Sequence, residues 1–138
     1  MAIELSFEIK KGDFSLAGKA SSKIKKMLKQ LNVDSKIIKR IVVAIYEAEV
    51  NVVAHSYGGN LKAKIDEKKI ELTVIDHGPG IENIEQAMEA GYSTASKKVR
   101  EMGFGAGMGL PNIKKNTDEL KITSKPGGGT TLFFRNYF

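Results

Sequence analysis

The chain has 138 residues, of which 41% are hydrophobic and 28% are charged. This length suits one domain with one core, residues 1–138, and the balance is that of a soluble globular protein. Cysteine is absent, which excludes disulfides and thiolate metal sites. The first residues lack a signal-peptide pattern, and no apolar run approaches the ~20 residues needed to cross a bilayer. We therefore expect a cytoplasmic protein without a membrane-spanning segment.

Basic residues dominate the charge, with a formal net charge of +6 and a pI of about 9.4. They recur in three stretches, residues 19–29, 36–40 and 62–69. No aromatic residues are interleaved with them and no nucleic-acid motif is present, so we do not expect a nucleic-acid partner. Solvated helix faces explain these lysines best, and an acidic protein partner is the second interpretation.

The predicted elements alternate between strands and helices along the chain. Residues 3–9 alternate apolar and polar side chains, as a strand does. A helix over residues 13–32 is expected to be capped by Asp13, and the next helix to start at Asp34 or Ser35. The remaining predictions are a hairpin of residues 61–66 and 69–76, a short helix over 83–91, an irregular glycine-rich stretch over 92–109, a helix over 110–118 with an early proline, and a closing hairpin over 119–138. This order favours an α/β (α+β) two-layer sandwich, with helices covering a mixed, mostly antiparallel sheet.

The second helix carries polar residues among valines and alanines, in the stretch "YEAEVNVVAH". At about 100° per residue, Glu47, Asn51 and His55 share one stripe, whereas Glu49 lies about 200° from Glu47. Burying a carboxylate without a partner is costly. The stripe therefore either faces a polar cavity or satisfies its own hydrogen bonds, and the helix alone does not decide between these two interpretations.

Three glycine-bearing segments follow. In "VIDHGPG" a strand ends at Asp76, whose carboxylate can accept a hydrogen bond from an amine, although a turn cap explains it equally well. In "GFGAGMGL", residues 103–110, alternate glycines precede a helix and expose N–H groups suited to phosphate. In "GGGTTLFF", residues 127–134, glycines deliver Thr130 to a strand, as a hairpin turn also would. Each segment alone is a weak signal.

The order and spacing of these segments, from about Ile38 to Phe134, resemble the GHKL ATPases, whose ATP-binding domain has the Bergerat fold. The resemblance implies ATP and Mg²⁺ as cofactors. It makes Glu47 the catalytic general base and Asn51 the magnesium ligand. It implies that Asp76 and Thr130 bind the adenine. The further nucleotide-binding residues that it implies are Gly78, Gly80, Ser93, Thr94, Gly105, Gly107, Gly109 and Leu110.

Within that superfamily, "DHGPGIENIEQAMEAGYSTASKK" and "GAGMGLPNIKK" are similar to the anti-sigma factor and switch-type serine/threonine protein kinases of bacterial stress and sporulation pathways. The insert Ala95–Phe104 departs from their pattern. The resemblance implies phosphorylation of a STAS-domain antagonist protein, and it implies a sigma factor or phosphatase as a further partner. The alternative is an ATP-dependent binding module that sequesters such a partner with little or no kinase activity. Relatives are often dimers, and the strand over residues 3–9 is a candidate edge for homodimer pairing.

Overall fold

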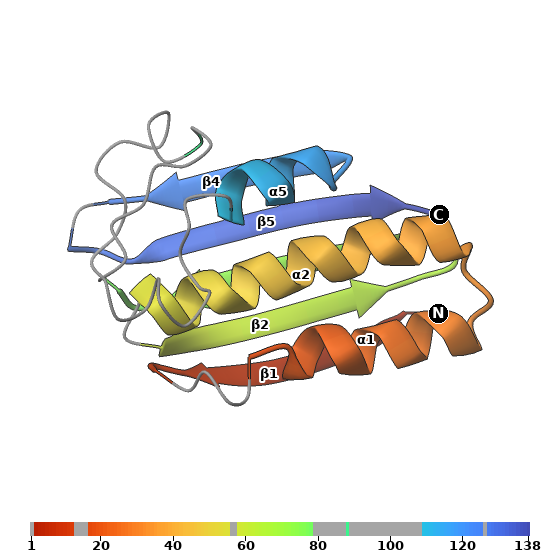
Figure 1. Cartoon of the computed structure of the whole chain (residues 1–138), viewed down its shortest axis with the longest axis horizontal. Coiled ribbons are helices and arrows are strands. Elements are labelled where there is room, and N and C mark those ends of the chain that lie inside the picture. The colour runs from red at the N-terminus through yellow and green to blue at the C-terminus, as the bar shows by residue number, and fades with distance from the viewer. Residues whose placement is uncertain (1, 13–16, 56–57, 79–87, 89–108, 126) are drawn as a thin grey trace.

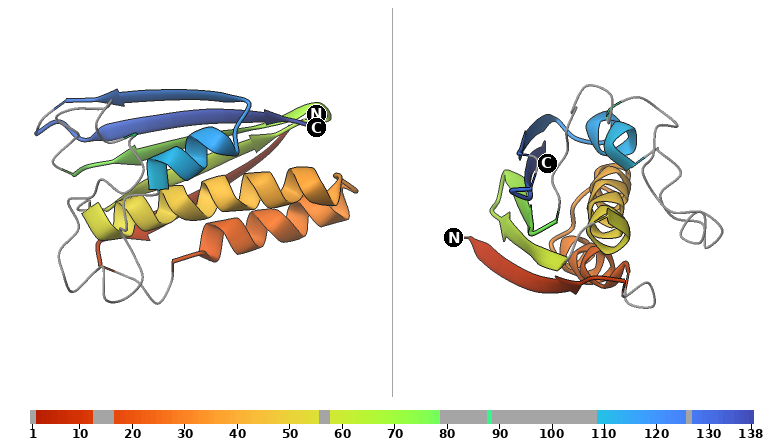
Figure 2. Two further views of the ribbon diagram at one scale, coloured as in Figure 1. Left: turned by 45° about the horizontal axis from the view of Figure 1, so that its top comes forward. Right: turned by 90° about the vertical axis from the view of Figure 1, so that its left-hand side faces the viewer.

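The fold is a two-layer α/β sandwich, seen in a computed structural model that describes residues 2–12, 17–55, 58–78, 88, 109–125 and 127–138. For His55, the structure describes the backbone but not the side chain. The predicted helix over 83–91, apart from Met88, and the glycine-rich stretch over 92–108 lie outside the described residues. Figures 1 and 2 show the helices α1, α2 and α5 on one face of the sheet, with the other face open.

The sheet has five strands in the order β1-β2-β3-β5-β4, and each described pairing is antiparallel. This confirms the predicted sandwich with a mostly antiparallel sheet. The predicted strands and hairpins are also confirmed. Their observed bounds are β1 Ile3–Lys10, β2 Gly58–Ile65, β3 Lys69–Asp76, β4 Glu119–Ser124 and β5 Thr130–Tyr137.

Helix α2 (Ser35–His55) runs along the sheet, and α1 (Lys19–Gln30) and α5 (Gly109–Lys115) flank it. Asp34 caps α2 by accepting a hydrogen bond from the backbone N–H of Lys36 at 2.8 Å, as its sequence position predicts. The predicted start of the first helix is wrong: α1 begins at Lys19, with Gly18 rather than Asp13 at its N-cap. Gly18 has no capping side chain of its own.

The core lies between the helices and the covered face of the sheet. Strand residues alternate between this face and solvent, so every second side chain of β2, β3 and β5 is buried. The fully buried large side chains of this core are Ile24, Leu28, Ile41, Ile45, Leu61, Ile65, Ile70, Leu72, Ile113 and Phe134. Among the described residues, no helix is long and apolar enough to cross a membrane.

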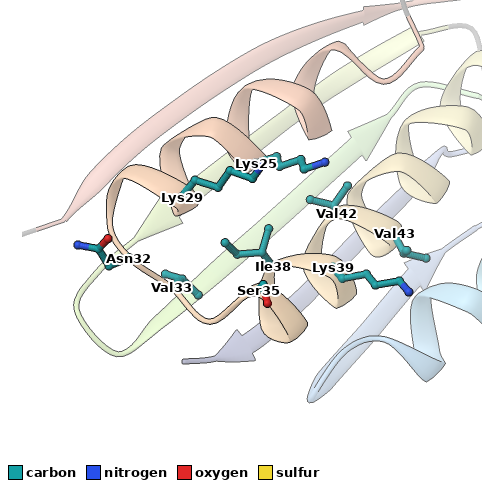
Figure 3. A pocket seen from close by; sticks show the side chains of 9 residues that line it. All are labelled: Lys25, Lys29, Asn32, Val33, Ser35, Ile38, Lys39, Val42 and Val43. Carbon is teal, nitrogen blue, oxygen red and sulfur yellow. The ribbon is translucent and has the colours of Figure 1, made fainter.

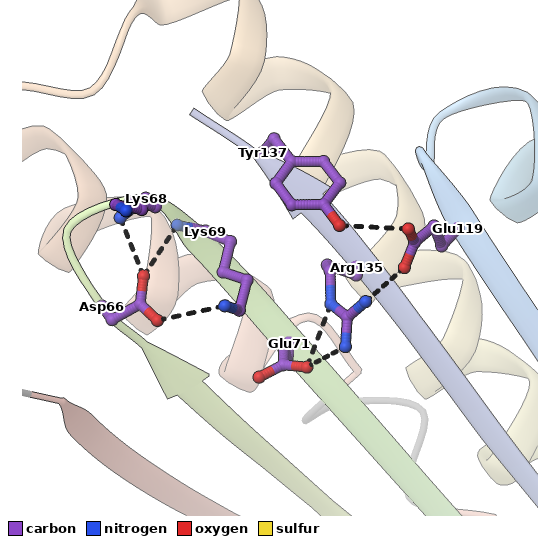
Figure 4. A network of polar contacts seen from close by, with 7 residues as sticks. All are labelled: Asp66, Lys68, Lys69, Glu71, Glu119, Arg135 and Tyr137. Atoms are coloured by element: carbon purple, nitrogen blue, oxygen red, sulfur yellow. Dashed lines mark hydrogen bonds and ion pairs between the residues drawn. The ribbon is translucent and has the colours of Figure 1, made fainter.

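The open face of the sheet carries a polar network across β3, β5 and β4 (Figure 4). The Arg135 guanidinium donates from Nε to Glu71 Oε2 at 3.0 Å and also pairs with Glu119, which accepts from Tyr137 Oη at 3.0 Å. Hydrogen bonds to Glu71, chiefly, raise the pKa of Arg135, so its charge is permanent. These contacts link the three strands on the face of the sheet that the helices leave open.

Candidate functional site

The candidate site lies at one end of the sandwich, where α2 ends, α5 begins, and β3 and β5 meet. Figure 1 shows α2 ending and β5 beginning at the left of the molecule, with the start of α5 beside α2. Strand β3 delivers Asp76 there, directly opposite Thr130 of β5 in the sheet register. Helix α2 delivers the predicted polar stripe to the same end because its last turns lie beside the first turn of α5.

Glu47 and Asn51 converge on the start of α5. A Cβ atom built on Gly109 would lie 3.3 Å from Asn51 Oδ1 and 3.5 Å from Glu47 Oε2. Both polar side chains are half-buried, whereas Ala48 and Val52 on the same helix are buried in the core. Glu47 and Asn51 therefore share a face of α2, as helical spacing predicts, and they present two oxygen atoms to one point beside the start of α5. The side chain of His55, the third residue of the predicted stripe, lies outside the described residues.

Asn112 orients the Glu47 carboxylate. Its Nδ2 donates a hydrogen bond to Glu47 Oε1 at 3.3 Å, across 65 residues of sequence. We did not predict this contact. The sequence holds one hint of it, since Asn112 follows Gly109 by three residues, which places both on the same side of α5. A hydrogen bond from a neutral amide steers a carboxylate without neutralising it.

Glu49 points away from this site, as the helical angle predicts, and caps α1. Its carboxylate accepts hydrogen bonds from the backbone N–H groups of Gly18, Ala20 and Ser21 at 3.1, 3.2 and 2.8 Å. The residue is only 3% exposed. Burial raises the pKa of the Glu49 carboxyl, and the hydrogen bonds oppose that rise. Glu49 thus joins α1 to the helix that carries the site.

Asp76 is the last residue of β3, and two glycines lie against it on the neighbouring backbone. The Gly78 N–H donates to its Oδ1 at 2.9 Å, so the turn-cap interpretation holds for one oxygen. Its other oxygen has no hydrogen bond to the described residues. A Cβ on the neighbouring Gly59 would lie 2.8 Å from Asp76 Cα and overlap the Ile75 carbonyl oxygen. A Cβ on Gly129 would overlap the Asp76 carbonyl oxygen, and its φ of +78° also favours glycine.

Thr130 lies on the helix-covered side of the sheet, beside a serine that sequence reasoning missed. Its Oγ1 is 2.8 Å from Ser124 Oγ, and Ser124 Oγ also donates to the Gly129 carbonyl at 3.0 Å. Register pairs Thr130 with Asp76 on one side and with Ser124 on the other. The three strand ends thereby form a polar row, which the hairpin pattern alone did not reveal.

The other predicted site residues divide into two groups. Leu110 is 7% exposed and belongs to the hydrophobic core, where it anchors α5 beneath the site. Gly80, Ser93, Thr94, Gly105 and Gly107 lie outside the described residues. Among the residues that the structure describes, no group of three or more His, Cys, Asp or Glu side chains is placed to hold a metal ion. Any divalent cation at Asn51 would need oxygen ligands from its own counter-ion, such as phosphates.

The fold combines an antiparallel sheet covered on one face with a long helix that carries Glu and Asn one turn apart, and it has an Asp at the facing strand end. This is the arrangement that the resemblance to the GHKL ATPases implies. The comparisons agree. The Histidine kinase-like ATPase domain family matches residues 13–135, and the chain belongs to this family.

Several curated proteins resemble this chain. An anti-sigma F factor of Thermoanaerobacter sp. (strain X514) is 36% identical over 113 residues, covering 78% of this chain and 76% of the relative. The serine/threonine-protein kinase RsbT of Bacillus subtilis (strain 168) is 33% identical over 97 residues, covering 67% of each chain. The sequence-based assignment to the superfamily and to its anti-sigma factor and kinase branch is therefore confirmed.

Solved structures share the fold. The RsbU and RsbW domains of Rv1364c from Mycobacterium tuberculosis align with a TM-score of 0.65 at 20% identity, covering 97% of this chain and 32% of that one. The SiaB-SiaC complex from Pseudomonas aeruginosa aligns with a TM-score of 0.55 at 15% identity, covering 97% and 89% of the two chains. At these identities the likeness concerns the fold alone.

Proposed function

We propose that this protein is an ATP-dependent serine/threonine protein kinase of an anti-sigma regulatory system. The observation that carries the proposal is the Glu47 carboxylate, held by Asn112 at 3.3 Å beside Asn51 and the start of α5. A domain that only bound nucleotide would not need a carboxylate there. The relatives named as an anti-sigma F factor and as a serine/threonine kinase support this choice of system.

ATP fits the residues at this end of the sandwich. The free oxygen of Asp76 is suited to accept a hydrogen bond from the adenine amine, with Thr130 beside it. The glycines at 59 and 129 let the neighbouring backbone approach the Asp76 strand closely, because side chains there would overlap that strand. Gly109 keeps the space in front of Asn51 open, and the first N–H groups of α5 suit a phosphate. When bound, Mg²⁺ supplies charge neutralisation of the phosphates, with Asn51 as its protein ligand.

The proposed reaction transfers the γ-phosphoryl group of ATP to a Ser or Thr hydroxyl of a protein substrate. The hydroxyl oxygen forms a bond to the γ-phosphorus, the bond from that phosphorus to the bridging oxygen breaks, and ADP leaves. Glu47 accepts the hydroxyl proton, and Asn112 holds the carboxylate in place for this. Most of the acceleration comes from positioning and charge stabilisation, and a general base contributes about 10²- to 10⁴-fold.

The substrate that we propose is a small STAS-domain antagonist, and the regulated partner is a sigma factor or a phosphatase. This part of the proposal rests on the family branch. Homodimerisation through β1 is also proposed, because β1 is an edge strand of the sheet. Sedimentation at micromolar concentration tests it, and a monomer there would contradict it.

Single-turnover transfer from labelled ATP to a candidate STAS protein tests the kinase proposal. Glu47→Gln keeps the side-chain shape but removes the base, so we expect transfer to fall by at least about 100-fold while ATP binding persists. Glu8→Gln, an exposed carboxylate on β1, is the matched control and should transfer normally. A stable complex with the partner and no label transfer by the wild-type protein would instead support the ATP-dependent binding module.

A further inference from the structure

A groove lies between α1 and α2, at the opposite end of α2 from the nucleotide site. Its volume is about 640 Å³. Val33, Ile38, Val42 and Val43 give it an apolar floor, and Figure 3 shows lysines of α1 and α2 on either side of that floor. From Lys39 to Asn51 the helix advances roughly 18 Å at 1.5 Å per residue. The groove is therefore separate from the candidate ATP site.

The charge of the whole molecule concentrates around this groove. Residues 19–45 contain eight lysines and arginines and a single acidic residue, Asp34, whereas the rest of the chain holds fourteen basic and fifteen acidic residues. Residues 19–45 therefore carry a net charge of +7, and the rest of the chain carries a net charge of −1. Of the groove lysines, Lys25 and Lys29 lie one helical turn apart, so their charges repel each other.

The groove lysines have no carboxylate partner among the described residues. The described ion pairs instead involve Arg40 with Asp118, Lys69 with Asp66, and Arg135 with Glu71 and Glu119. Asp34, the one acidic residue nearby in sequence, is engaged in capping the N-terminus of α2. A row of like charges without counter-charges, flanking a recessed apolar floor, is complementary to a ligand that carries acidic side chains on both sides of apolar ones.

We propose that this groove docks an acidic amphipathic helix of a protein partner. Such a helix would place apolar residues at i, i+4 and i+7 on Val33, Ile38 and Val42, with acidic residues facing the lysines of α1 and α2. Nucleic acid fits less well, because residues 19–45 contain no aromatic side chain on which a base can stack. A membrane surface also fits less well, because the apolar residues are recessed in the groove rather than protruding.

The probe for this proposal is a fluorescent helical peptide of about 18 residues, with leucines at the anchor positions and glutamates elsewhere. Its binding to the full chain is measured by anisotropy, and the contacted residues by NMR chemical shifts. Two further peptides are compared with it: one has serine in place of leucine, and the other has lysine in place of glutamate. Anionic vesicles and duplex DNA are titrated in parallel.

Two triple variants distinguish an effect of the groove lysines from an effect of net charge. Changing Lys25, Lys29 and Lys39 together to Gln should weaken binding of the acidic peptide at least about tenfold. Changing Lys62, Lys64 and Lys121, which are exposed on the open face of the sheet, to Gln removes the same charge and should leave binding nearly unchanged. ATP binding, measured separately, should be normal in both variants, so this test is independent of the proposed kinase activity.

The expected result is saturable binding of the leucine-glutamate peptide alone, with shifts at Val33, Ile38 and Val42. Equal weakening by both triple variants would overturn the proposal, because binding would then follow net charge only. Equal binding of the serine peptide would overturn it as well, since the apolar floor would have no role. Binding of vesicles or DNA at these residues, without peptide binding, would assign the surface to those partners instead.

Discussion

In the candidate site, single residues are positioned by close packing of side chains against backbone, and not by an extended hydrogen-bond network. Gly109 is the clearest case, since it leaves room beside both Glu47 and Asn51. Gly109 is the first residue of α5, where the cost of glycine in a helix interior does not apply in full. A substitution there should therefore change the site more than it changes the stability of the fold.

We predict that Gly109→Ala weakens binding of magnesium-ATP without destabilising the fold. The added Cβ would lie 3.3 Å from Asn51 Oδ1, within the space that a metal ligand needs. At this first residue of α5, helix propensity separates glycine from alanine less than in a helix interior, so the free energy of unfolding should stay close to that of the wild type. Calorimetry with ATP and urea unfolding of the same samples check this. Normal affinity in the alanine variant would contradict the assignment of Asn51 to the metal.

Asp76 has one oxygen committed to Gly78 and one available. We predict that Asp76→Ala greatly reduces ATP affinity, because the adenine amine would lose its charged acceptor. For the same reason GTP should bind poorly to the wild-type protein, since its ring carbonyl would face the carboxylate. Asp76→Asn is the matched comparison, because it retains an acceptor for Gly78. Titrations of the three proteins with ATP and GTP measure these affinities. Unchanged ATP affinity in the alanine variant would show that Asp76 does not bind the adenine.

At the scale of elements, the sequence predicted those features that depend on residues close together in the chain, and it missed most of those that depend on distant residues. Strands and hairpins followed from local alternation, and the start of α2 from the adjacent Asp34. The start of α1 was missed because its cap, Glu49, lies 28–31 residues away in sequence. Asn112 was missed for a similar reason, since its contact with Glu47 spans 65 residues. Ser124 lies only six residues from Thr130 and was missed because the hairpin pattern does not fix the strand register. The Asn112 contact joins α5 to α2, two elements whose approach no spacing rule encodes.

Glu49 supplies the test at this scale. We predict that Glu49→Gln lowers the free energy of unfolding by roughly 1–3 kcal/mol, because an amide group would face three backbone N–H donors with one acceptor fewer. The loss of negative charge at the α1 N-terminus adds to this effect. Urea unfolding of the variant, beside Glu8→Gln as control, measures it. Wild-type stability in Glu49→Gln would show that the cap is energetically dispensable.

At the scale of the molecule, the two layers are joined mainly by the apolar core, and polar contacts of Asp118 also link them at the edge of the sheet. Asp118 accepts a hydrogen bond from the Tyr137 N–H at 2.8 Å and pairs with Arg40 of α2 at 3.1 Å. Its own N–H donates to the Arg135 carbonyl at 3.0 Å. It thus links α2 to the last residues of β5, beside the start of β4.

These contacts of Asp118 should make stability depend on acid pH. The Tyr137 N–H, chiefly, and the Arg40 guanidinium hold the pKa of Asp118 below its usual value near 3.8. The folded state therefore binds this proton more weakly than the unfolded state does. The contribution is complete above about pH 4 and is lost as pH falls through the folded pKa.

We predict that wild-type protein is more stable than Asp118→Asn at neutral pH, by less than about 1 kcal/mol because the carboxylate is solvent-exposed. The difference should shrink as pH falls from about 4 to 2. Urea unfolding across this range measures it, and a double-mutant cycle with Arg40→Gln isolates the ion pair. A difference independent of pH would mean that Asp118 acts through its shape and hydrogen bonding alone.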